Sequence, residues 1–131
     1  MHFSELRIYQ LAVQFETAAE ELIKKIPYYW EIEQVDQVSR STASISANIV
    51  EGFNRRFYPK DYIRFLNIAL SSSDESQHHF TILFAKKCID KTSYDFYLKA
   101  YRDLSIRILN FILYLKKKHQ ISQFNPPMAP Q

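Results

Sequence analysis

Apolar residues recur at the three- and four-residue steps of an α-helix along most of the chain. The clearest series opens the sequence and consists of Ile8, Leu11, Phe15, Ala18 and Leu22. This periodicity predicts four helices, over residues 4–26, 31–51, 59–89 and 93–118. Four long helices with short connections are typical of an antiparallel up-down-up-down bundle. We therefore expect an all-α fold with a single bundle domain over residues 1–119.

Residues that favour helix ends stand at the predicted boundaries. Ser4 is an acceptable N-cap for the first helix. Gly52, the single glycine of the chain, suits a left-handed C-cap of the second helix. Pro59 fits the first turn of the third helix, where its missing N–H is harmless. Thr92 and Asp95 have the spacing of a capping box at the start of the fourth.

The predicted helix over residues 31–51 has two organised faces. Its apolar face, which we expect to enter the core, consists of Val35, Val38, Thr42, Ile45 and Ile49. Its polar face follows steps of three and four residues and consists of Gln37, Arg40, Ser44, Asn48 and Glu51. A surface helix needs only one organised face, so the polar face calls for a separate explanation.

The polar face has a matching face on the next helix. In an antiparallel hairpin, facing residues have a nearly constant sum of residue numbers. This rule predicts four facing pairs, which are Glu51–Arg64, Asn48–Asn67, Ser44–Ser71 and Arg40–Glu75. We therefore predict two ion pairs between the helices, with small polar residues between them. We interpret this polar ladder as a device that sets the register of the two helices, rather than as a ligand or catalytic site, because it lacks a nucleophile with its base.

Length and composition limit the classes of function. A chain of 131 residues suits one domain, and a formal net charge of +3 permits a nucleic-acid partner without requiring one. The lone Cys88 cannot form an internal disulfide, which suggests a reducing cytoplasm. We expect no signal peptide and no membrane association, since no apolar run approaches the length of a transmembrane helix. The Pro-rich stretch 120–131 is expected to be disordered.

The fourth predicted helix carries more apolar residues than a four-helix core can bury. Beyond its main stripe it has a second row, made of Ile106, Leu109 and Leu113. If exposed, this row predicts self-association. The alternative is that the fourth helix is central and buried on two sides.

Several segments together resemble a known family. They are Ile8–Ala12 (IYQLA), the spaced motif Gln37, Arg40, Ser44-Ile45, Asn48-Ile49 and Glu51-Gly52, the following Arg55 and Arg56, and the stretch Arg64-Phe65-Leu66 through Ala69, Ser72 and Glu75. On these residues the chain resembles the four-helix bundle proteins, also called 23S rRNA intervening-sequence proteins. It departs from the usual pattern at Ser71-Ser72-Ser73 and at Val50.

The resemblance implies a homopentameric ring of bundles, encoded within intervening sequences of bacterial rRNA genes and without an established enzymatic activity. A more distant relative is the accessory variability protein of diversity-generating retroelements. It is a basic pentamer that works with a reverse transcriptase and nucleic acid. This kinship suggests nucleic-acid binding.

The up-down order brings the connection between the second and third helices to the C-terminal end of the fourth. That end gathers six cationic residues, which are Arg55, Arg56, Lys60, Lys116, Lys117 and Lys118. Aromatic residues lie between them in the sequence, so phosphates and unpaired bases could both be bound there. The alternative is a solvated lysine run that favours the helix C-terminus through its dipole.

Other chemical candidates are weaker. Glu75 and His78 match one half of a di-iron motif, but such a site needs a second copy that the sequence lacks. We predict no metal, no cofactor, no catalytic residue and no small-molecule substrate. The leading hypothesis is a non-enzymatic, cytoplasmic homo-oligomer, favoured as a pentamer, that binds RNA or DNA through its basic end. The alternative is a protein–protein adaptor without nucleic-acid contact.

Overall fold

The computed structural model describes residues 1–121, and within this range the fold is all-α, with no strand. The four main helices are α1 (Arg7–Lys24), α2 (Glu33–Asn54), α3 (Pro59–Ala85) and α4 (Lys91–Lys118). Two short 3-10 helices, η1 (Phe3–Glu5) and η2 (Tyr29–Glu31), precede α1 and α2. The predicted disordered segment lies almost entirely outside the described residues.

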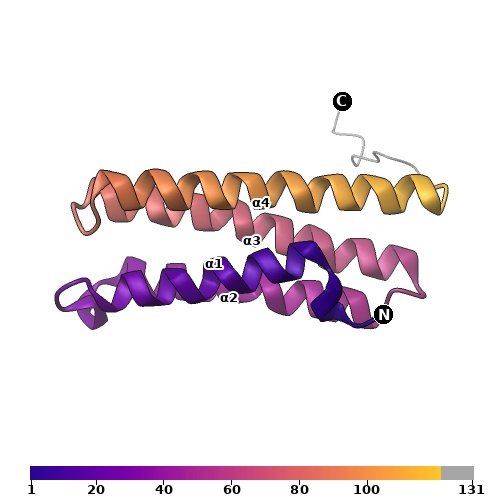
Figure 1. Ribbon diagram of the computed structural model, residues 1–131, viewed down its shortest axis with the longest axis horizontal. Coiled ribbons are helices and arrows are strands. Elements are labelled where there is room, and N and C mark those ends of the chain that lie inside the picture. The colour runs from indigo at the N-terminus through magenta and orange to yellow at the C-terminus, as the bar shows by residue number, and fades with distance from the viewer. Residues whose placement is uncertain (122–131) are drawn as a thin grey trace, which may run out of the picture.

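The helices lie along a common long axis, as Figure 1 shows. The α1–α2 and α3–α4 connections lie at one end of the molecule. The α2–α3 connection, the N-terminus and the end of α4 lie at the other. We call this second end, with the residues around Arg55–Lys60 and Lys116–His119, the basic end.

The apolar stripes of all four helices meet in one core. Its fully buried side chains include Ile45, Leu66, Phe80, Tyr101 and Ile108. Stacked rings link α3 to α4. The ring of Phe80 lies 4.9 Å from that of Tyr97 and 5.8 Å from that of Tyr101, and the ring of Phe84 lies 4.5 Å from that of Tyr94. The periodicity in the sequence therefore predicted which faces of the helices are buried.

The start of α1 and the end of α2 differ from the prediction. Ser4 belongs to η1, which is capped by His2, and α1 begins only at Arg7 after Leu6. Helix α2 continues through Gly52 to Asn54, and no glycine of the chain has a positive φ. Gly52 is therefore not a left-handed C-cap, and its role lies elsewhere.

The α3–α4 connection also differs from the prediction. Helix α3 ends at Ala85 rather than near residue 89, because Lys87 adopts a left-handed φ of 61°. The Cys88 N–H then donates to the Leu83 carbonyl at 2.9 Å, as in a Schellman motif. Helix α4 is capped by Asp90, whose Oδ1 accepts from the Ser93 N–H at 2.8 Å. The predicted Thr92–Asp95 capping box is wrong, since Asp95 pairs with Lys91 at 2.8 Å.

Candidate nucleic-acid interface

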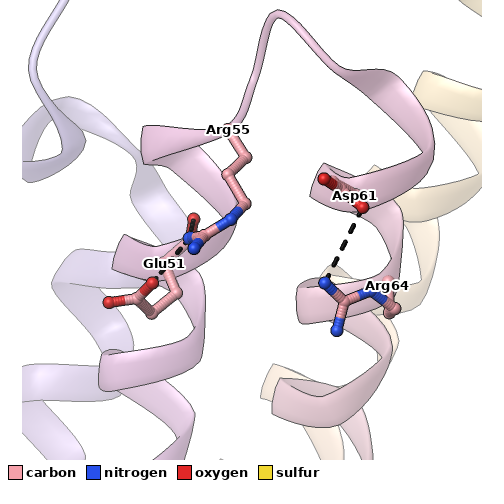
Figure 2. A network of polar contacts seen from close by, with 4 residues as sticks. All are labelled: Glu51, Arg55, Asp61 and Arg64. Carbon is pink, nitrogen blue, oxygen red and sulfur yellow. Dashed lines mark hydrogen bonds and ion pairs between the residues drawn. The ribbon is translucent and has the colours of Figure 1, made fainter.

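The charged ends of the predicted polar ladder form ion pairs within their own helices. Figure 2 shows Glu51 paired with Arg55 at 2.6 Å and Arg64 paired with Asp61 at 3.7 Å. At the other end, Arg40 pairs with Asp36 at 2.9 Å, and Glu75 is exposed. The predicted Glu51–Arg64 and Arg40–Glu75 pairs are therefore wrong. Partners three or four residues away on the same helix are closer than those across the hairpin.

Near the middle of the hairpin, the polar contacts between α2 and α3 use serines one or two positions away from the predicted register. The Ser72 hydroxyl donates to Ser44 Oγ at 2.9 Å, and the Ser41 and Ser76 hydroxyls lie 2.8 Å apart. Asn48 donates to Ser44 on its own helix, whereas Asn67 and Ser71 are exposed. These contacts form a serine seam without charges between the two helices.

Gly52 lies where α2 and α3 approach most closely. A Cβ atom at this position would lie 3.0 Å from Cδ1 of Tyr62, 3.2 Å from Cβ of Phe65 and 3.2 Å from the Tyr62 carbonyl oxygen. These distances are shorter than ordinary van der Waals contacts, and one of the atoms belongs to the backbone. Gly52 therefore allows the first turn of α3 to pack directly on α2, and it fixes the position of Tyr62 at the basic end.

Tyr62 forms part of the wall of a cavity at the basic end. The cavity has a volume of about 480 Å³ and is enclosed by residues from the N-terminus, the α2–α3 connection, α3 and α4. Its lining consists of Met1, Leu6, Phe53, Arg56, Phe57, Tyr62, Phe111, Tyr114, Leu115, Lys118 and His119. Burial raises the pKa of Tyr62 to about 12, and the positive charge of Arg56 partly opposes this rise. The Tyr62 hydroxyl is therefore protonated at neutral pH.

Three of the predicted cationic residues line this cavity or its neighbour, and they come from the α2–α3 connection, α3 and α4. Arg56 and Lys118 line it, and Lys60 lines a neighbouring cavity together with Tyr58 and His119. Arg55 lies 4.8 Å over the ring of Phe65 while it pairs with Glu51. Lys117 and Lys118 are exposed in the last turn of α4, and Lys116 is half-buried.

Arg56 contacts two aromatic rings and a backbone carbonyl. Its guanidinium lies 4.2 Å over the ring of Phe53 and 4.7 Å over that of Phe57, and it donates to the Phe53 carbonyl at 3.1 Å. Cation–π contacts on two rings hold the charge at the cavity without neutralising it. An anion that reaches the cavity would therefore meet a positioned guanidinium.

The sequence analysis missed part of this site. It placed Arg56 and Lys118, which line the cavity, at one end of the bundle, because they adjoin the α2–α3 connection and the end of α4. It did not include Met1 and Leu6, which line the cavity from the N-terminal segment. No motif marks these two residues, since their place depends on how η1 folds over the end of the bundle.

The second apolar row of α4 is partly exposed in the single chain. Ile106 is 52% exposed and Leu109 is 43% exposed, and Leu113 is half-buried. Within one chain, α4 is therefore not buried on both sides. Self-association through this row stays a prediction.

Two other sequence candidates do not converge on a site. His79 contacts Gln34, and burial lowers its pKa, while the neighbouring His78 is exposed. Within residues 1–121, no group of three or more His, Cys, Asp or Glu side chains is arranged to hold a metal ion. None of the helices described is long and apolar enough to cross a membrane.

Comparison with known proteins places the chain in a family. Residues 4–110 match the family described as 23S rRNA-intervening sequence protein, so Lys116–Lys118 lie outside the matched range. A crystal structure from Bacteroides thetaiotaomicron VPI-5482, described as a protein of unknown function from the S23 ribosomal protein family, has a TM-score of 0.73. It is 24% identical and covers 80% of this chain and 97% of its own.

Neither description names an enzymatic activity. Among curated proteins, no match to this chain was found. The structural likeness supports the fold, while the family match covers most of the chain and agrees with the motif around Glu51-Gly52. This protein belongs to the 23S rRNA-intervening sequence protein family.

Proposed function

We propose that this protein is a non-enzymatic, up-down-up-down bundle that assembles into a homopentameric ring and binds RNA or DNA through its basic end. The observation that carries the proposal is the meeting of Arg56, Lys60 and Lys118 around aromatic side chains. These residues come from the α2–α3 connection, the first turn of α3 and the end of α4. Lysines and arginines bind phosphates, and aromatic rings stack on unpaired bases.

Binding to a structured RNA and to a DNA of the same sequence, measured by fluorescence anisotropy at increasing salt, tests this proposal. Reversing Arg56, Lys117 and Lys118 to Glu should weaken binding by about 100-fold and lower its salt dependence, because several phosphate contacts are lost. The matched control reverses Lys24, Lys25 and Lys86 at the opposite end and should change binding by less than about twofold. Salt-independent binding, or equal effects of the two variants, would contradict the proposal.

The exposed row on α4 supports assembly. Ile106 and Leu109 form an apolar surface that a second copy of the chain could cover. Changing both to Glu should yield a monomer by light scattering, whereas Phe96→Glu, at another exposed apolar position of α4, should keep the assembly. A monomeric wild-type protein at micromolar concentration would contradict assembly.

The second candidate is a protein–protein adaptor, which the same apolar row of α4 favours. An adaptor would need Ile106 and Leu109 for a partner and would tolerate charge reversal at the basic end. The two sets of variants therefore separate the candidates. Crosslinking in cells, followed by sequencing of bound nucleic acid, identifies the nucleic acid if the first candidate holds.

A further inference from the structure

The cavity at the basic end differs from a general phosphate-binding surface. A phosphate backbone needs only exposed cations, but this cavity is a concave space of about 480 Å³ with mainly apolar and aromatic walls. Its volume falls within the range of pockets that hold small organic molecules or single groups of a larger one. The aromatic wall residues come from four segments, which are the end of α2, the α2–α3 connection, α3 and α4.

The exposed aromatic side chains give the cavity accessible ring faces. Phe57 is 79% exposed and Tyr114 is 56% exposed, although both line the cavity. Tyr114 also stacks on Phe111, with ring centroids 6.1 Å apart and nearly parallel planes. A flat aromatic ligand could stack on these exposed ring faces.

Two cations also line the same cavity. Arg56 lies over Phe53 and Phe57, and it uses one N–H to bond the Phe53 carbonyl. A guanidinium has five N–H donors in a planar fork, which suits a phosphate. Lys118 lies on the same lining, with its Nζ 6.0 Å from the centre of the Tyr114 ring. The positive charges of Arg56 and Lys118 therefore complement an anion attached to a group inside the cavity.

We propose that this cavity receives one unpaired nucleobase, with the adjoining phosphate bound by Arg56 and Lys118. A base inside a duplex is stacked on both faces and cannot enter, so the protein distinguishes unpaired from paired nucleic acid. Phe57 and Tyr114 supply the stacking faces. This inference rests on the proposed function, because it specifies which part of a nucleic acid the basic end recognises.

The experiment compares two RNA probes of equal length. One is a blunt duplex, and the other is a hairpin with a single-stranded extension that carries the fluorescent base 2-aminopurine. Wild-type protein should bind the extended hairpin more tightly and quench the fluorescence of the base. Phe57→Leu and Tyr114→Leu should each weaken binding to the extension by about 10-fold, in line with the loss of one base–aromatic stack, and should abolish quenching. Binding to the blunt duplex should not change.

The matched control is Phe96→Leu, because Phe96 is also 56% exposed on α4 but lines a different cavity, with Phe15 and Lys99. This variant should bind both probes like the wild type. If the wild type binds both probes equally and all three variants behave alike, the cavity is not a base site and the proposed function still stands. If the wild type binds neither probe, both this inference and the proposed function are contradicted.

Discussion

The single glycine of the chain and the left-handed turns lie at different positions of the bundle. At the basic end, the glycine lies inside α2 with an ordinary helical conformation, packed against Tyr62 and Phe65. The left-handed residues are not glycine: Tyr28 (φ 55°) and Lys87 (φ 61°) lie at the opposite end, and Gln120 (φ 55°) follows α4 at the basic end. The glycine is therefore present for close packing of two helices, not for a turn.

The cationic groups at the two ends also differ in their partners. At the opposite end, Lys24 pairs with Glu21 at 3.7 Å and Lys91 pairs with Asp95 at 2.8 Å. At the basic end, Arg55 pairs with Glu51 at 2.6 Å, but Arg56 lies on aromatic rings beside the cavity. Close packing at Gly52 positions the cavity wall, so the backbone and the candidate site are connected at this end.

The largest effect should come from Gly52→Leu, which tests whether close packing positions the basic end. Leucine improves helix propensity by about 0.8 kcal/mol. Overpacking against the α3 backbone costs about 3 kcal/mol, because a carbonyl oxygen cannot move as a side-chain end can. We expect a net loss of about 2 kcal/mol in the free energy of unfolding, measured by urea denaturation.

Ala47→Leu is the control, because Ala47 lies in α2 and is exposed. It should change stability by less than about 0.5 kcal/mol. A Gly52→Leu variant as stable as this control would show that α3 can move away from α2 at little cost. Close packing would then not explain the glycine at position 52.

Between the two ends, Tyr101 tests whether the core contains a removable defect. Its hydroxyl is buried, has no hydrogen-bond partner within residues 1–121, and its pKa is raised mainly by burial. Tyr101→Phe should therefore stabilise the protein by up to about 1 kcal/mol, since an unsatisfied buried polar group is removed. Thermal unfolding at pH 6 and pH 9 should show the same gain, because the hydroxyl stays protonated. A loss of stability would indicate a partner for this hydroxyl.

At the opposite end, a glycine in place of Lys87 should increase the stability of the protein. Lys87 is exposed and occupies the left-handed position of the Schellman motif that ends α3. Lys87→Gly should stabilise the protein by about 0.5 kcal/mol, because the strain of a left-handed L-residue exceeds the entropy cost of glycine. The control is Lys86→Gly, because the neighbouring Lys86 does not have a positive φ. Thermal unfolding of the two variants measures the difference in their stability. Equal effects would remove the contrast with Gly52.

The sequence allowed the helices and their buried faces to be predicted, because the apolar periodicity at Ile8, Ile45 or Ile108 depends only on local spacing and burial. It did not allow the register of α2 and α3 to be predicted from charge. Glu51 and Arg64 each have an oppositely charged partner within one turn of their own helix. These local ion pairs form instead of the pair across the hairpin. Serines, which have no strong local charge partner, make polar contacts across the hairpin instead.

Gly52 and the N-terminus show a second limit. A glycine near the end of a helical pattern fits a C-cap and a close helix contact equally well, and only the position of Tyr62 decides between them. Met1 and Leu6 enter the cavity through a short 3-10 turn that has no apolar periodicity. The cations of the basic end were predictable from helix order, whereas the cavity that they surround was not.

The smallest expected effect is the pH dependence of the cap at Asp90, at the end opposite the cavity. The backbone hydrogen bond from Ser93 is the main reason that the pKa of Asp90 is lowered. A lowered pKa in the folded state means that the cap stabilises the protein above the unfolded pKa of about 4, and that this contribution is lost as the pH falls through the folded value.

Asp90→Asn keeps a capping acceptor but does not titrate. The fall in melting temperature from pH 7 to pH 3 should therefore be slightly smaller for Asp90→Asn than for the wild type. At the basic end, α3 is preceded by Tyr58, which makes no side-chain cap, so Tyr58→Phe should leave the same pH dependence unchanged. If Asp90→Asn lost as much stability on acidification as the wild type, the cap would not be a pH-dependent feature of the opposite end.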